Sequence, residues 1–263
     1  MKKTNLTLIN NNHEPKSISK DCKYKPSTLV LLGVGGLKRA GKDSVCDLLV
    51  KHHDFEKIAL AANLRIICHR TFGVSIEEMV SDDLKEKPFK KPIELTERKI
   101  SELIIRCFKE YPYLYPNVDF EVYHQNVCKN GIFDWTGTKF LTPRHMLQIV
   151  GTELIRNCIR NDFHISVVTH YIHNKCKDNE RLGLNPPKIS ISDCRFPDER
   201  YFVKAMGGNL MLITSPTDSR DCIHSSETQR GKVDEYDFHY HNVKEGLDKL
   251  EVNFLKFLDS KVK

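Results

Sequence analysis

The sequence predicts an α/β protein with a doubly wound, mostly parallel sheet, and three observations carry this prediction. A continuous β-prone run at residues 28–34 leads into a glycine-rich turn, which is typical of a central strand buried on both faces. Strand-like and helix-like patterns then alternate along residues 28–73 and 141–258. The length of 263 residues suits one large domain, or one domain with a sizeable insertion.

Residues 1–27 differ from the rest of the chain in composition. They are rich in Asn, Lys and Ser, and their few apolar residues follow neither a helical nor a strand period. Such a segment buries too little apolar surface to offset the entropy lost on ordering it. We therefore expect a disordered tail at residues 1–27 and a folded domain at residues 28–263.

The first elements of the domain follow a strand–helix order. After the strand at 28–34 and the glycines of residues 35–41, a helix is predicted from residue 42 to about residue 52. A second, short strand is expected at 55–60. Apolar residues at helical spacing then predict a helix over 61–72, which ends at a glycine.

Residues 74–140 have a less regular pattern. A helical period is present over 94–111, whereas 112–140 mixes proline, glycine and aromatic residues. The second stretch predicts an irregular excursion or a small hairpin. We interpret residues 74–140 as an inserted segment of mostly helical or irregular structure.

Regular structure returns at Thr142, a good helix N-cap, followed by Pro143 at the first helical position. The elements expected after this helix are a helix at 162–175, a strand at 188–193, a helix at 197–206, strands at 209–214 and 238–241, and a closing helix with Leu247, Leu250, Phe254 and either Phe257 or Leu258 facing inward.

The charge distribution bears on the choice of partner. The formal net charge is +6, but residues 1–27 carry six lysines against two acidic residues, which leaves +2 for residues 28–263. A protein that tracks a phosphate backbone needs a dense basic face, which +2 does not provide. We therefore expect no nucleic-acid partner.

The cysteines and the apolar runs indicate the compartment. The nine cysteines lie at least 18 residues apart and show no zinc-binding spacing, so we expect reduced thiols that are mostly buried. The longest apolar run, residues 29–34, is far shorter than the ~20 residues that span a bilayer. We expect a soluble, cytoplasmic protein with no membrane partner.

Residues 36–44, Gly-Leu-Lys-Arg-Ala-Gly-Lys-Asp-Ser, match the glycine–four residues–glycine–lysine phosphate loop. They stand between a strand and a helix, as that motif requires. The glycines let backbone N–H groups surround a phosphate, the helix N-terminus favours an anion, and the lysine reaches the β- and γ-oxygens. Gly36, Gly41 and Lys42 are thus predicted to bind ATP. The alternative is a glycine-rich turn without a ligand.

Asp43 occupies the position where the common loop has Ser or Thr, and Ser44 follows one step later. A carboxylate 4 Å from a phosphate charge is repelled by about 4 kcal/mol at an effective dielectric near 20. A carboxylate at this position is compatible with bound phosphates if it holds a cation directly or through water. Mg²⁺ is a suitable cation, because it prefers oxygen ligands. Asp43 and Ser44 are therefore candidate Mg²⁺ ligands. The alternative is a loop that has lost its activity.

Lys38 and Arg39 place two cations inside the loop. A loop that holds one nucleotide does not need them. They suit an enzyme that brings a second phosphorylated molecule against the first, because cations offset the repulsion between donor and acceptor.

Two later segments carry polar residues in suggestive positions. Arg144 and Gln148 are four residues apart and share one helix face, although a solvated face explains this spacing as well. Asp193 ends a predicted strand, where open α/β sheets bind ligands, and its plain alternative is helix capping. The loop with His224 and Glu227 by itself indicates nothing.

Together these segments resemble the deoxynucleoside monophosphate kinases of phages and large viruses. The resemblance covers roughly residues 28–73 and 141–258 and departs at Phe163, where many members carry Trp, in residues 74–140 and in the tail. It rests on the loop at 36–44, on Thr-Pro-Arg…Leu-Gln…Gly-Thr-Glu at 142–153, on Asp-x-Arg-Phe-Pro-Asp-Glu at 193–199, on His-x-Ser-Glu at 224–227 and on the closing helix, in the family's order.

The resemblance implies a P-loop kinase fold and the transfer of a phosphoryl group from ATP, with Mg²⁺, to a (deoxy)nucleoside 5'-monophosphate. It places residues 74–140 on the acceptor side, leaves room for a homodimer, and implies host cytoplasm if the source is viral. The catalytic candidates are Lys42, Arg39 and Arg195, and Arg39, Asp43 and Ser44 are also candidates for binding ATP. The acceptor-binding candidates are Lys38, Arg65, Arg144, Gln148, Gly151, Thr152, Asp193, Arg195, Glu199 and Glu227, and Asp193 is also a metal candidate through bound water.

Two other functions fit the same residues. Animal-type phosphomevalonate kinase has a similar loop and a comparable Ser-Asp-x-Arg turn, and it needs no base pocket. A catalytically silent P-loop module would bind ATP without transferring phosphate. No general base is assigned for the kinase readings, because an acceptor phosphate with a second pKa of ~6 is already largely ionised at neutral pH.

Overall fold

A five-stranded sheet forms the centre of the computed structural model, which describes residues 29–37, 39–216 and 231–260. The strand order is β2-β5-β1-β6-β7, and every neighbouring pair is parallel. The doubly wound α/β fold predicted from the sequence is confirmed. The strands are β1 (Val30–Gly36), β2 (Glu56–Ile58), β5 (Lys188–Ile191), β6 (Asn209–Thr214) and β7 (Phe238–His241).

Strand β1 lies in the middle of the sheet and is buried on both faces. Leu31 packs into the core on one face, whereas Leu32 and Val34 pack into the core on the other. This placement explains the continuous apolar run, because neither face of a central parallel strand meets water.

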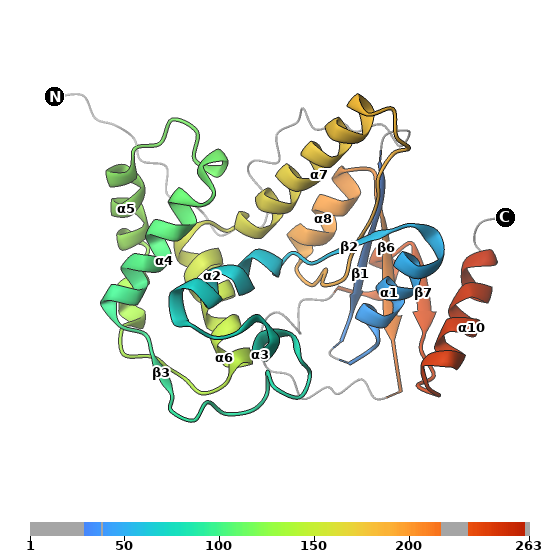
Figure 1. Ribbon diagram of the computed structural model, residues 1–263, viewed down its shortest axis with the longest axis horizontal. Coiled ribbons are helices and arrows are strands. Elements are labelled where there is room, and N and C mark those ends of the chain that lie inside the picture. The colour runs from blue at the N-terminus through green and yellow to red at the C-terminus, as the bar shows by residue number, and fades with distance from the viewer. Residues whose placement is uncertain (1–28, 38, 217–230, 261–263) are drawn as a thin grey trace.

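Helices cover both faces of the sheet (Figure 1). Helices α1 (Lys42–His53) and α10 (Leu247–Asp259) bury Leu49 and Phe254 against β1, β6 and β7 on one face. Helices α7 (Phe163–Arg181) and α8 (Pro197–Ala205) bury Ile172 and Phe202 on the other. The alternation of strands and helices along the chain therefore gives three layers.

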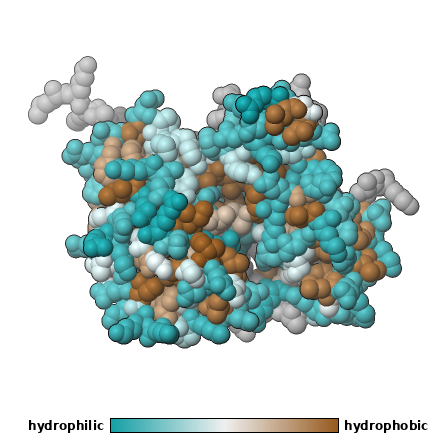
Figure 2. All heavy atoms as spheres, viewed as in Figure 1, coloured by the Kyte–Doolittle hydropathy of each residue, from teal (hydrophilic) through white to brown (hydrophobic). Residues whose placement is uncertain are grey.

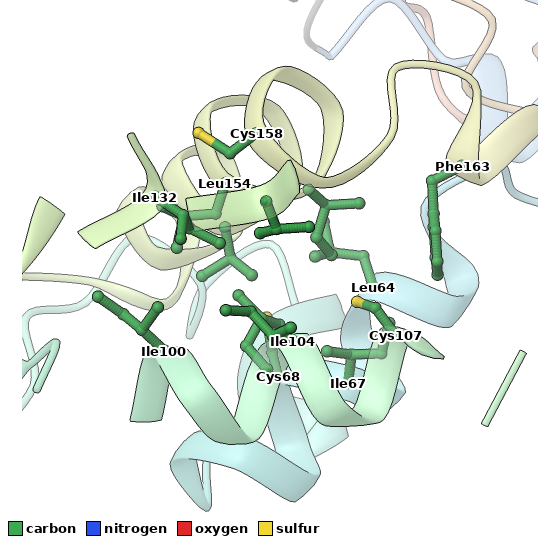
Figure 3. Close-up of a cluster of buried hydrophobic side chains, with 14 of the residues drawn as sticks. Leu64, Ile67, Cys68, Ile100, Ile104, Cys107, Ile132, Leu154, Cys158 and Phe163 are labelled. Carbon is green, nitrogen blue, oxygen red and sulfur yellow. The ribbon is translucent and has the colours of Figure 1, made fainter. Parts of the chain in front are cut away.

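A separate group of helices stands beside the sheet, at the left in Figure 1, with a hydrophobic core of its own. In Figure 3, Ile100, Ile104 and Cys107 of α4 lie opposite residues of the α2 and η3 helices. The elements of this helical part are α2 (Ala62–Phe72), α3 (Ile76–Val80), β3 (Ile93–Glu94), α4 (Glu97–Lys109), η1 (Pro112–Leu114), α5 (Phe120–Lys129), η2 (Ile132–Trp135), β4 (Lys139–Phe140), α6 (Pro143–Gln148) and η3 (Ile149–Ile159).

Residues 112–140 are more regular than the sequence suggests. The Asp119 side chain accepts a hydrogen bond from Glu121 N (2.7 Å) and caps helix α5. No hairpin forms within the segment, because β4 pairs antiparallel with β3 instead. The expectation of a local hairpin is therefore wrong, and the aromatic residues that suggested irregular structure pack into the helical core.

The helix that begins at Thr142 has an unusual continuation. Thr142 caps it as predicted, since its hydroxyl accepts a hydrogen bond from His145 N (3.0 Å). After Gln148 the helix widens into the π-helical η3, over 11 residues. π-Helical segments are rare and frequently occur at functional sites.

The other expectations have mixed outcomes. Helix α7 extends six residues beyond the predicted end at 175. Leu247 was expected to face inward, but it is 71% exposed, because the buried face of α10 starts only at Leu250. Within the described parts of the chain the seven cysteines are free, and all but Cys128 are buried. No helix in these parts is long and apolar enough to cross a membrane. The predictions for residues 1–27, Lys38 and Glu227 concern positions outside the described residues.

Candidate functional site

The parallel sheet brings the predicted site segments to one edge. The 36–44 loop follows β1, the turn with Asp193 follows β5, and Leu60 follows β2, so all three lie at the carboxyl ends of neighbouring strands. Ligands of open α/β sheets bind at this edge. In the space-filling view the molecule is hollowed between the helical part, at left, and the sheet with its helices, at right (Figure 2).

Two glycines of the 36–44 loop adopt backbone conformations that side chains rarely permit. Gly36 has φ 145° and Gly41 has φ 102°. A Cβ at Gly36 would lie 2.3 Å from the Ile213 carbonyl oxygen, and one at Gly41 would lie 2.5 Å from Asn242 Nδ2. The spacing of these glycines is therefore a requirement of the loop shape, which also places Arg39 in the left-handed region at φ 63°.

The loop is held from the other end of the chain. The buried Asn242, which follows β7, donates a hydrogen bond from Nδ2 to the Ala40 carbonyl oxygen (3.0 Å). Lys244 Nζ donates to the Arg39 carbonyl oxygen. These two contacts hold the peptide groups on both sides of Ala40.

Lys42 lies inside the loop and is only 8% exposed. Its Nζ donates hydrogen bonds to the carbonyl oxygens of Gly36 (2.9 Å) and Leu37 (2.7 Å). Lys42 is also the first residue of α1, so a buried ammonium and a helix N-terminus occupy the same place. Both favour an anion there.

Asp193 connects two loops at the sheet edge. Its Oδ1 accepts a hydrogen bond from Leu60 N (2.7 Å), and its Oδ2 accepts one from Ala61 N (3.1 Å). Ala61 precedes α2 and provides no side-chain cap of its own. Asp193, from a distant part of the chain, therefore supplies the hydrogen-bond acceptors for the two backbone N–H groups that precede α2.

Glu199 is buried beneath the turn that carries Arg195. Its Oε2 accepts hydrogen bonds from Arg195 N (2.6 Å) and Phe196 N (2.9 Å). Burial raises the pKa of Glu199 to about 7, although the two N–H donors and Arg156 oppose this shift. These contacts support the shape of the turn, so a direct contact between Glu199 and the acceptor stays a prediction.

The helix α6–η3 carries the other predicted acceptor residues. Arg144 Nη1 lies 3.5 Å from Glu86 Oε1 in an ion pair. Gln148 and Thr152 are half-buried. A Cβ at Gly151 would lie 2.6 Å from Leu64 Cδ2, so this glycine lets η3 pack closely on α2, which also carries Arg65.

Comparison with known proteins identifies the family. The model of the deoxynucleotide monophosphate kinase family matches residues 30–242. The chain belongs to this family. A protein of Acanthamoeba polyphaga mimivirus named "Putative deoxynucleotide monophosphate kinase" is 27% identical over 214 residues, which cover 80% of this chain and 86% of the relative. The resemblance inferred from the sequence is confirmed, and the protein is a phosphotransferase.

The family match frames the site of this kinase. It runs from the first residue of β1 to Asn242, so it includes the five strands, the 36–44 loop and the helical part. Membership of a monophosphate kinase family implies a nucleotide phosphate donor and a nucleoside monophosphate acceptor. The loop and the turn with Arg195 are the charged segments at the sheet edge that could receive them.

The oxygen donors near the loop differ in how they could hold a metal ion. Asp43 is directed to the surface, with its side chain 74% exposed and Oδ1 3.0 Å from Lys57 Nζ. Burial would lower the pKa of Lys57, but hydrogen bonds to Asp47 and Asp43 outweigh it and raise that pKa. Ser44 is half-buried in the first turn of α1 and has no side-chain hydrogen bond within the described residues.

The donor set therefore fits a Mg²⁺ ion held mainly by phosphate oxygens and water. Mg²⁺ commonly uses only one or two protein ligands in such sites. The Ser44 hydroxyl is suitable, and Asp193 could act through water. No group of three or more His, Cys, Asp or Glu side chains that could hold a metal occurs in the part of the chain that the structure describes.

We expect Asp43→Asn to leave the dependence of turnover on Mg²⁺ unchanged, with kcat within about twofold of the wild type, because it removes only an exposed ion pair. The measurement is turnover against Mg²⁺ concentration at saturating ATP. Asp47→Asn is the matched control, since Asp47 is the second partner of Lys57 on the same helix. A loss in Asp43→Asn alone that high Mg²⁺ recovers would assign the metal role to Asp43.

We expect Glu199→Gln to change how the free energy of unfolding depends on pH. Folding raises the Glu199 pKa to about 7, so between pH 4.5 and 7 the folded state holds a proton that the unfolded state has lost. The stability from this group is complete at low pH and is lost as pH rises through 7, by up to about 3 kcal/mol.

Urea unfolding at pH 5 and pH 8 measures this effect. The wild type should lose stability relative to Glu199→Gln over that range. The matched control is Glu235→Gln. The backbone N–H of Lys232 and the Arg200 side chain lower the pKa of Glu235, whereas the pKa of Glu199 is raised. A constant difference between wild type and Glu199→Gln would contradict the raised pKa.

Three residues with contacts at the candidate site were not predicted from the sequence. Asn242 and Lys244 contact the loop from more than 200 positions away, and no motif marks them. Arg156 was missed as well, although it continues the i, i+4 row of Arg144, Gln148 and Thr152. That row is the signal that could have found it.

Proposed function

We propose that this kinase transfers the terminal phosphoryl group of ATP, with Mg²⁺, to a (deoxy)nucleoside 5'-monophosphate at the carboxyl edge of the sheet. The observation that carries the proposal is the buried Lys42 ammonium, held by the carbonyl oxygens of Gly36 and Leu37 at the N-terminus of α1. A buried cation at a helix N-terminus is suited to a polyphosphate, and the family supplies the acceptor class.

On the donor side, the loop binds and orients the phosphates. Backbone N–H groups between Gly36 and Ser44 would surround them, while Lys42 exchanges its carbonyl partners for phosphate oxygens. Bound Mg²⁺ would neutralise the β- and γ-phosphate charge. Ser44 would hold it, with Asp193 as a partner through water, while Asp43 would stay paired with Lys57 at the surface.

On the acceptor side, the need is for cations that bring two anions together. Arg39 from the loop and Arg195 from the β5–α8 turn would screen the transferring group, and Arg144 would bind the acceptor phosphate. Positioning and charge neutralisation dominate phosphoryl transfer, so no side chain has to remove a proton. Lys38, Arg65, Gln148, Gly151, Thr152 and Glu227 complete the proposed acceptor set.

A coupled ADP-release assay with ATP and Mg²⁺ tests this function. The acceptors to be tested are the ribo- and deoxyribonucleoside 5'-monophosphates. Mevalonate 5-phosphate is tested as an acceptor as well, because its turnover would indicate the rival kinase activity. We expect turnover with at least one deoxynucleoside monophosphate and none with mevalonate 5-phosphate. Turnover with mevalonate 5-phosphate alone would assign the rival kinase activity. ATP binding without turnover of any acceptor would show a silent nucleotide-binding module.

A further inference from the structure

Arg156 of η3 is almost enclosed, with its side chain 15% exposed. It forms an ion pair with Asp198 Oδ2, and its Nη1 lies 3.8 Å from Glu199 Oε1. Its guanidinium also stacks on the Phe196 ring, 4.0 Å from the centroid. All three contacts reach from the π-helical segment to the turn and first residues of α8.

Glu199 links Arg156 to the backbone of Arg195. One carboxylate oxygen faces Arg156, while the other accepts the hydrogen bonds from Arg195 N and Phe196 N. The backbone of Arg195 is thus held by a carboxylate that Arg156 in turn holds. Arg156 and Glu199 thus connect η3 with Arg195 in the β5–α8 turn.

A further contact joins η3 to α7. The buried His164, near the start of α7, is hydrogen-bonded to the backbone of Gly151 in η3. Burial lowers the pKa of His164 to about 4, so this ring is neutral near pH 7. The charge that pairs with Asp198 and Glu199 is therefore that of Arg156 and not that of the nearby His164.

We propose that Arg156 is a positioning residue that fixes Arg195 relative to the acceptor helix α6–η3. The inference rests on the proposed function, because it gives Arg195 and this helix the two sides of the acceptor phosphate. Arg156 touches neither substrate. It acts through Glu199 and through the ring of Phe196.

The test compares Arg156→Met and Arg156→Lys with Arg160→Met in the full chain. Arg160 is a matched control, because it too combines an ion pair, to Asp162, with a ring contact, to Tyr115, yet makes neither with the β5–α8 turn. Kinetics with the acceptor selected by the screen give kcat and the KM values for ATP and for the monophosphate. Hydrogen exchange of the peptide with residues 194–199 reports the turn directly.

We expect Arg156→Met to lower kcat by roughly tenfold to a hundredfold, which is the effect of small misplacements in such sites. The KM for the monophosphate should rise while the KM for ATP stays within about twofold. Arg156→Lys should restore part of kcat, and exchange at 194–199 should accelerate in both Arg156 variants, more strongly in Arg156→Met, but not in Arg160→Met. Combined with Arg195→Met, Arg156→Met should add little further loss, because residues that act through one another are not additive.

Unchanged exchange at residues 194–199 in Arg156→Met, or equal kinetic losses in Arg156→Met and Arg160→Met, would overturn the proposal. If Arg156→Met does not fold, Arg156→Lys decides by the same two measurements. Absence of turnover in the wild type would refute the proposed function instead. The exchange comparison would still show whether Arg156 holds the turn.

Discussion

Lys42→Met should lower kcat by at least about a hundredfold while the fold persists. The ammonium lies at the N-terminus of α1, 2.7 and 2.9 Å from two loop carbonyl oxygens. Methionine keeps the length and apolar stem of lysine but removes the charge that would meet the transferring phosphoryl group. The measurement is kcat with the best acceptor, together with the thermal midpoint.

Lys51→Met is the control for this change. Lys51 is on the same helix, but its side chain is 60% exposed and pairs with Glu251 at the far end. Its replacement should leave kcat unaltered, because it removes only a surface ion pair. If a folded Lys42→Met enzyme kept wild-type turnover, the 36–44 loop would not be the donor site.

Asp193→Ala should lower the free energy of unfolding by about 2–5 kcal/mol, since it leaves Leu60 N and Ala61 N without their acceptor. For a protein of this size, that corresponds to a fall in thermal midpoint of about 5–15 °C. Turnover should fall as well, because the start of α2 and the end of β5 lose their connection at the sheet edge. Urea unfolding and kcat, measured below the lowered midpoint, check both effects.

Asp237→Ala separates the two effects. Asp237 also accepts a hydrogen bond from a backbone N–H, that of Leu210 (2.7 Å), but at the start of β6, away from the carboxyl edge. It should reduce stability with little change in kcat. A loss of stability without loss of turnover in Asp193→Ala would show that Asp193 serves the fold alone.

The sheet was predictable because its information is local. The run at 28–34 and the alternation at 188–193 and 209–214 mark strands by composition alone. The start at Thr142 was predictable for the same reason, since a cap and its N–H partner are three residues apart. The 36–44 loop was predictable for the same reason, because its glycines are required by the backbone conformation of the loop itself.

The missed features depend on contacts between distant residues. Asp193 accepts bonds from residues more than 130 positions away, so the sequence could mark it as a strand-end carboxylate but not as a connection to α2. The direction of Asp43 depends on Lys57 in β2. The pairing of β4 with β3 depends on a partner beyond the segment in which a hairpin was expected.

The contact of Asn242 and Lys244 with the 36–44 loop bears on the order in which the protein matures. The loop lies near the beginning of the chain, but its backbone is braced by residues synthesised some 200 positions later. Strand β1 also pairs only with β5 and β6, both translated long after it. Such distant pairings form slowly, and a growing chain cannot make them until their partners emerge from the ribosome. The 36–44 loop therefore reaches its final shape among the last parts of the molecule, although it is translated among the first.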